Sequence, residues 1–126
     1  MMYYKELTDC ETMVMKTIWE ANGEISVQEI IDKVADIYGK RMKRTTASTF
    51  ILRLRDKGYI EGRQEGRNVY YRPLVLEDEY KQSRAKDYLQ FWYSGSLEKA
   101  VTMLCETAKL SDEQCERIRN AINELD

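Results

Sequence analysis

Histidine is missing from this sequence of 126 residues, and its absence excludes imidazole general bases, Ser-His triads and His-ligated zinc sites. Proline occurs once and glycine six times, which argues against a loop-rich β-sandwich. No apolar run approaches the length of a membrane span, and no signal-peptide pattern opens the chain. We therefore expect a cytoplasmic protein that is not inserted in a membrane.

Cysteine is scarce as well, and Cys10, Cys105 and Cys115 contain no CxxC pair. This odd count predicts neither a disulfide framework nor a metal site. We expect half-buried thiols in a reducing compartment, with no metal and no cofactor. No paired-carboxylate or nucleophile motif stands out either, so the sequence predicts a protein that is not an enzyme.

The composition is that of a globular chain, with 43% hydrophobic and 33% charged residues. The overall charge of −2 conceals an uneven distribution. Residues 38–73 hold ten basic and three acidic groups, a net charge of +7, whereas residues 74–126 hold seven basic and eleven acidic groups, a net charge of −4. Such asymmetry is expected when only one part of a chain meets a polyanion.

Capping boxes mark the first two helices. The box at Thr8–Glu11 predicts a helix that begins near Asp9 and ends at Asn22-Gly23, and the box at Ser26–Glu29 predicts a short second helix. A basic loop over residues 38–43 then leads to a third helix over residues 44–57, which Gly58 ends.

The pattern then changes from helical to alternating. Residues 59–64 and 69–73 are rich in aromatic and β-branched side chains, and the turn sequence Glu65-Gly66-Arg67-Asn68 lies between them. Three helices and a hairpin in this order are typical of a winged helix-turn-helix. We expect a mostly α-helical chain with a small β-hairpin, in which a winged-helix DNA-binding domain (1–75) precedes a helical dimerisation domain (76–126).

The C-terminal part predicts helices over residues 77–92, 96–108 and 111–125. Three short, polar helices cannot easily close a core of their own. They either pack back on the first domain or pair with a second copy of the chain, and we favour the second copy. The apolar residues expected to make this dimer are Leu89, Trp92, Leu97, Val101, Leu104, Ile118 and Ile122.

The third helix has two faces of opposite character. Ala47, Phe50, Ile51 and Leu54 share the face that points to the core. The other positions carry short hydroxyls flanked by cations, which suit a DNA major groove. We expect phosphate contacts from Lys43, Arg44 and Arg53, and base contacts from Thr46, Ser48 and Thr49, with Thr45 beside them.

The hairpin predicts a second DNA contact. Arg63, Arg67 and Asn68 lie around its turn, where a wing follows the phosphates or enters the minor groove. Tyr70 and Tyr71 alternate across the strand, so one of the two rings should pack inward.

Four segments resemble the penicillinase-repressor family (BlaI and MecI, with the copper-responsive CopY repressors as relatives). They are LTDCETMVMKTIW in the first helix, TTASTFILRLRDKGYI in the third, EGRNVYY in the wing and YSGSLEKAV in the C-terminal part. The resemblance extends from Leu7 to Asp126 and implies a homodimeric winged-helix repressor that binds a palindromic operator.

The resemblance also concerns induction, the step that releases a repressor of this family from its DNA. In the β-lactam-responsive members, a membrane sensor protease triggers cleavage in the C-terminal helices at an Asn-Phe pair, and Met103-Leu104 is the matching position here. The copper-responsive relatives carry a C-terminal cysteine cluster that this sequence does not have. The chain is therefore closer to the family's scaffold than to either mode of induction.

A second class of function stays open at this point. A winged helix can serve protein–protein contact only, with its basic face bound to an acidic partner. The charge asymmetry suits both classes, whereas the hydroxyl-rich face of the third helix favours DNA. A steep loss of duplex binding with rising salt would distinguish DNA binding from the alternative.

Overall fold

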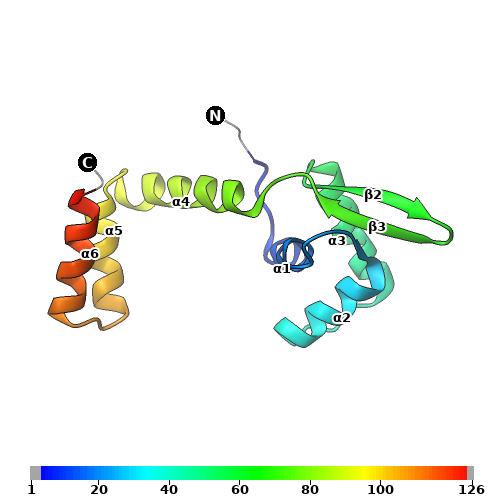
Figure 1. Cartoon of the computed structure of the whole chain (residues 1–126), viewed down its shortest axis with the longest axis horizontal. Helices are drawn as coiled ribbons and strands as arrows, with labels where there is room; N and C mark the ends of the chain where they lie inside the picture. The colour runs from blue at the N-terminus through cyan, green and yellow to red at the C-terminus, as the bar shows by residue number, and fades with distance from the viewer. Residues whose placement is uncertain (1–3, 125–126) are drawn as a thin grey trace. The chain divides into compact units, whose positions relative to one another are not determined.

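The computed structural model describes residues 4–124 and divides the chain into two compact units, residues 1–80 and 81–126. Within the described residues the elements, of which Figure 1 labels all but β1, are α1 (Asp9–Glu20), β1 (Ile25–Ser26), α2 (Val27–Tyr38), α3 (Arg44–Asp56), β2 (Ile60–Glu65), β3 (Asn68–Pro73), α4 (Glu77–Tyr93), α5 (Leu97–Thr107) and α6 (Asp112–Glu124). The expected end of the last helix at Leu125 lies outside the described residues. The predicted element order and mostly helical fold class are confirmed, and β1 is an addition.

The two predicted capping boxes are both formed. Thr8 accepts a hydrogen bond from the Glu11 amide, the Glu11 carboxylate accepts one from the Thr8 amide, and Ser26 and Glu29 repeat the arrangement. These reciprocal bonds satisfy amides that a helix start otherwise leaves without partners. They therefore fix the starts of α1 and α2.

The sheet has three antiparallel strands in the order β1-β3-β2. The two-residue strand β1 pairs with Tyr70 and Tyr71 of β3, and the ring of Tyr71 packs inward, as expected for one of the two tyrosines. Gly62 of β2 lies opposite Tyr71, where an added Cβ would come within 2.9 Å of the ring. The glycine therefore makes room for the ring that anchors the hairpin to the core.

The core of the first unit is formed by α1, α2, α3 and the sheet. Met15 and Ile18 from α1, Ile30 from α2, and Ile51 and Leu54 from α3 are fully buried. The unit extends past the predicted domain boundary at residue 75, because the Tyr80 ring packs 5.4 Å from Trp19 and 5.8 Å from Tyr59 between ring centroids.

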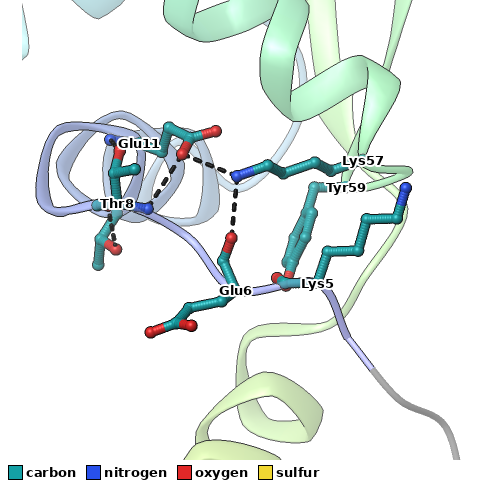
Figure 2. A network of polar contacts seen from close by, with 7 residues as sticks. Lys5, Glu6, Thr8, Glu11, Lys57 and Tyr59 are labelled. Carbon is teal, nitrogen blue, oxygen red and sulfur yellow. Dashed lines mark hydrogen bonds and ion pairs between the residues drawn. The ribbon is translucent and has the colours of Figure 1, made fainter.

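A buried carboxylate ties the start of α1 to the residue that follows α3 (Figure 2). The Glu11 side chain is 1% exposed, and its Oε1 accepts hydrogen bonds from Lys57 Nζ at 2.8 Å and from the Thr8 amide at 3.0 Å. Lys57 Nζ also donates to the Glu6 carbonyl at 2.9 Å. Burial alone would raise the pKa of Glu11, but the bonds from Lys57 and Thr8 outweigh it and lower that pKa.

The second unit contains a much smaller core. Helices α5 and α6 lie antiparallel, and their buried cluster consists of Val101, Cys105 and Cys115, with Leu110 and Ile122 packed against it. Ser111 and Gln114 exchange hydrogen bonds before α6, as its capping pattern predicts. No residue of α4 is buried.

No helix within residues 4–124 is both long enough and apolar enough to span a bilayer. Within the same residues, no group of three or more cysteine and acidic side chains is placed to hold a metal ion.

Candidate nucleic-acid interface

The outer face of α3 carries the hydroxyls and cations that the sequence singled out. Ala47, Ile51 and Leu54 are buried against the core, with Phe50 half-buried beside them. Their spacing orients the remaining positions away from the core. Exposed side chains there are Lys43, Arg44, Thr45, Thr46, Thr49 and Arg53, and Ser48 is half-buried.

The N-terminus of α3 has no side-chain cap. Lys43 occupies the capping position and makes no side-chain capping bond, and the first turn contains no acidic residue. The first bond within the helix runs from the Ala47 amide to the Lys43 carbonyl, so the three amides of residues 44–46 precede it, beside the exposed cations Lys43 and Arg44. The helix dipole adds to this positive potential, which suits an anion such as a phosphate oxygen.

The hydroxyls on this face differ in what they bind within the chain. Thr49 Oγ1 donates to the Thr45 carbonyl at 3.0 Å, so its remaining capacity is as an acceptor. Among residues 4–124, no hydrogen bond engages the hydroxyls of Thr46 and Ser48. Both can donate or accept toward a base edge or a phosphate.

Nine of the ten basic residues of the stretch 38–73 fall into two groups, and the tenth, Lys40, donates a hydrogen bond to the sulfur of Cys10. Four of them form ion pairs within the chain: Arg55 with Asp56, Lys57 with Glu11, Arg63 with Glu24 and Glu65, and Arg72 with Glu61. Within the described residues, no ion pair involves the following exposed cations: Arg41, Lys43, Arg44, Arg53 and Arg67. This second group keeps its charge available to a partner.

Arg63 is held by acidic neighbours, although its side chain is 52% exposed. Its Nε donates to Glu24 at 2.8 Å, a second nitrogen donates to Glu65 at 3.1 Å, and its guanidinium lies 5.4 Å from the centre of the Tyr70 ring. The hydrogen bond to Glu24 and then that to Glu65 raise the pKa of Arg63 above its ordinary value. The sequence could not reveal this pairing, since Glu24 lies 39 positions away.

The tip of the wing presents Arg67 and Asn68. Both side chains are exposed, and they follow Gly66, whose φ of 61° is the left-handed conformation that glycine adopts without strain. Arg41, in the loop before α3, was missed as a candidate. It belongs to the same run of positive charge, which is the signal that could have identified it.

The residues expected to make a dimer separate into two groups. Trp92 (64% exposed), Leu104 (62%), Leu97 and Ile118 present their side chains to solvent, and Leu89 is half-buried. Val101 and Ile122 instead contribute to the core between α5 and α6. The candidate cleavage position, Met103-Leu104, lies on α5 with both side chains exposed.

Known proteins are similar to this chain along most of its length. The penicillinase repressor of Bacillus licheniformis is 29% identical over 119 residues, which cover 94% of this chain and 91% of that protein. The methicillin resistance regulatory protein MecI of Staphylococcus aureus (strain N315) is 29% identical over 118 residues, or 94% of each chain.

Solved structures of DNA-binding proteins are similar to this chain in fold. The DNA-binding domain of the repressor BlaI is 31% identical, with a TM-score of 0.52 over 64% of this chain and 94% of that chain. The same values hold for the monomeric form of Bacillus licheniformis BlaI in complex with the blaP half-operator. H. salinarum RosR matches 95% of this chain at a TM-score of 0.53 and 13% identity, which shows a shared fold alone.

The family model described as penicillinase repressor matches residues 7–124, so it includes the winged helix and the C-terminal helices together. The chain therefore belongs to the penicillinase repressor family, a family of transcriptional repressors and not of enzymes.

Proposed function

We propose that this chain is a homodimeric transcriptional repressor that binds a palindromic DNA operator through α3 and the β2–β3 wing. The observation that carries the proposal is the outer face of α3, where exposed hydroxyls stand between unpaired cations. A helix with such a face fits the major groove, which is about 12 Å wide. The similarity to a BlaI solved with a half-operator supports the same mode of binding here.

Each group on this surface has an expected role. Thr46, Ser48 and Thr49 approach base edges, with Thr45 beside them, because their short side chains reach the groove floor without steric conflict. Lys43, Arg44 and Arg53 bind phosphates and so position the helix. Arg67 and Asn68 at the wing tip contact the neighbouring backbone or minor groove.

The second unit supplies the pairing of two copies. The side chains of Trp92, Leu97, Leu104 and Ile118 are exposed, so a lone chain leaves these four large apolar groups in water. Covering these side chains with the same residues of a second copy gives a two-fold symmetric dimer, whose two α3 helices match the half-sites of a palindrome.

Proteolysis at Met103-Leu104 is a candidate route to induction. A sensor protease of the kind that acts in β-lactam-responsive members would find both residues exposed on α5. Cleavage there would cut α5 and release α6, and it would thereby weaken the pairing of the two copies.

The proposal is tested by measuring binding to a duplex that the full chain selects from a random library. We expect Thr46→Ala and Arg53→Ala to weaken binding by 1 kcal/mol or more each, about a factor of five or above, with unchanged circular dichroism. Affinity should also fall by orders of magnitude between about 50 and 200 mM salt, because phosphate contacts release counterions.

The matched control is Arg55→Ala. Arg55 lies on the same helix but pairs with Asp56, so its removal should change binding little. Unchanged binding by both Thr46→Ala and Arg53→Ala would remove α3 as the recognition helix. A duplex complex insensitive to salt would instead favour the protein-interaction alternative.

The wing gives a separate prediction, in which Arg67 and Arg63 differ in their effect on the salt dependence of DNA binding. Arg67→Ala should weaken binding to all duplexes alike and reduce the slope of log affinity against log salt by about 1, because one phosphate contact is lost. Arg63→Ala should change this slope less, since Glu24 and Glu65 already neutralise its charge. Fluorescence anisotropy across a salt series measures both slopes. A larger slope change for Arg63→Ala would contradict the assignment.

A further inference from the structure

Two cysteines share the small core between α5 and α6. Cys105 lies in the last turn of α5 and Cys115 in the first turn of α6, and their side chains are 6% and 9% exposed. Together with Val101 they make up the whole buried cluster of the described part of this unit. The connection between the helices is short, and within it the Leu110 amide donates to the Cys105 carbonyl at 3.1 Å.

Cys105 and Cys115 are neighbours in this buried cluster. A hydrogen bond with Cys105 raises the pKa of the Cys115 thiol, and burial adds to the effect. Asp112 acts in the same direction and Arg119 in the opposite one. Cys10 is separate from this pair, since it lies in α1 of the first unit, where Lys40 Nζ donates to its sulfur at 2.6 Å.

We propose that Cys105 and Cys115 form a reversible dithiol site, which a low-molecular-weight disulfide oxidises to an intramolecular disulfide. One thiol loses its proton and attacks the oxidant, which releases one small thiol and leaves a mixed disulfide. The second cysteine then attacks this mixed disulfide and releases the other small thiol. The two cysteines lose two protons and two electrons in total. The electrons reduce the sulfur–sulfur bond of the oxidant, and the protons end on the two small thiols that are released.

Access of the oxidant follows from how little holds this unit together. With three buried side chains in the α5–α6 cluster, local opening costs far less free energy than unfolding of the first unit. Opening exposes either thiol, and the other cysteine is then the nearest nucleophile. A disulfide requires the two sulfurs at about 2.05 Å from each other, which opening of the helix ends allows.

The disulfide would change the stability of α5. It would join the end of α5 to the start of α6 and restrict the unfolded states of the segment between them. A protease must unfold a helix locally before it can cut it, so the oxidised chain should be cleaved more slowly within residues 97–107. The exposed Met103-Leu104 bond lies directly before Cys105 and would share this protection.

The first experiment maps thiols in the full-length protein after incubation with glutathione disulfide. Trypsin cleavage after Lys99, Lys109 and Arg117 places Cys105 in the peptide 100–109 and Cys115 in the peptide 110–117. We expect these two peptides joined, with a mass lower by two hydrogens than their sum, and separated again by dithiothreitol. Cys10→Ser should leave the link intact, and Cys105→Ser should abolish it.

Two results would overturn the proposal. One is that Cys105 and Cys115 keep free thiols, or a stable glutathione adduct, under conditions that modify Cys10. The other is a link that involves Cys10. Because the mapping uses the unaltered chain, it does not depend on the folding of a variant.

The second experiment follows cleavage within residues 97–107 by a non-specific protease. Oxidation should slow this cleavage several-fold in the Cys10→Ser chain and leave it unchanged in Cys105→Ser. Equal cleavage of the oxidised and reduced Cys10→Ser chain would refute the stabilising effect. Neither measurement involves DNA binding, so a failure of this proposal can be distinguished from a failure of the proposed repressor function.

Discussion

A chain that ends after Arg84 is expected to bind its selected operator at least about 100-fold more weakly than the full chain. Two linked half-site contacts bind with an avidity that neither has alone, commonly 10² to 10⁴-fold. The cut removes most of the second unit but keeps Tyr80, whose ring packs against Trp19 and Tyr59. Anisotropy at fixed salt measures the affinities, and sedimentation measures the mass of each species.

Point substitutions provide a matched control for this truncation. Trp92 and Leu104 are 64% and 62% exposed and belong to no buried cluster, so Trp92→Glu and Leu104→Glu should leave the helices folded. We expect both to shift the full chain toward monomer and to lower operator affinity in parallel. A full-length chain that sediments as a monomer at micromolar concentration would contradict the proposed dimer. A truncated chain with undiminished affinity would do so as well.

The largest effect on stability is expected from Lys57→Met, which should lower the free energy of unfolding by about 3 kcal/mol. The substitution keeps the aliphatic stem of Lys57 but leaves the Glu11 carboxylate buried without its cation. Glu11→Gln should cost less, about 1 kcal/mol, because the charge then left without a partner is that of Lys57, which is 26% exposed to water and still donates to the Glu6 carbonyl. The double variant Glu11→Gln/Lys57→Met should therefore be more stable than Lys57→Met alone, as urea denaturation can show.

The same pair predicts how stability depends on pH. The pKa of Glu11 is lowered in the folded chain, against about 4.3 in an unfolded one. Its stabilising contribution is therefore complete above about pH 5 and is lost as the pH falls through the folded-state pKa. Glu11→Gln should lack this component. A double variant no more stable than Lys57→Met, or an acid profile unchanged by Glu11→Gln, would show that the pair is not coupled.

Local sequence signals were sufficient for most of the fold. The boxes at Thr8 and Ser26 predicted the starts of α1 and α2 because each bond in a capping box joins residues three positions apart. The turn at Gly66 likewise marked the hairpin. Such signals depend on neighbours within one turn of the chain, so the sequence displays them directly.

Features that depend on distant partners could not be predicted. Strand β1 has only two residues and exists because Ile25 and Ser26 pair with Tyr71 and Tyr70. For the same reason, the pairing of Arg63 with Glu24 was not foreseen. Among the candidate site residues, the sequence predicted which side chains carry charge. Only the structure separates the cations that are paired within the chain from those that are not.

The missing cap of α3 has a consequence for the energetics of DNA binding. The three free amides at the start of this helix, beside Lys43, lower its stability in the unbound chain. A phosphate oxygen of the DNA that accepts hydrogen bonds from these amides would complete the first turn. The same amide donors would therefore both order the helix and bind the duplex. A serine or aspartate in place of Lys43 would make a better helix start and thereby compete with the phosphate. A residue at position 43 that stabilises the unbound recognition helix would therefore weaken operator binding, and one that leaves the amides free favours it.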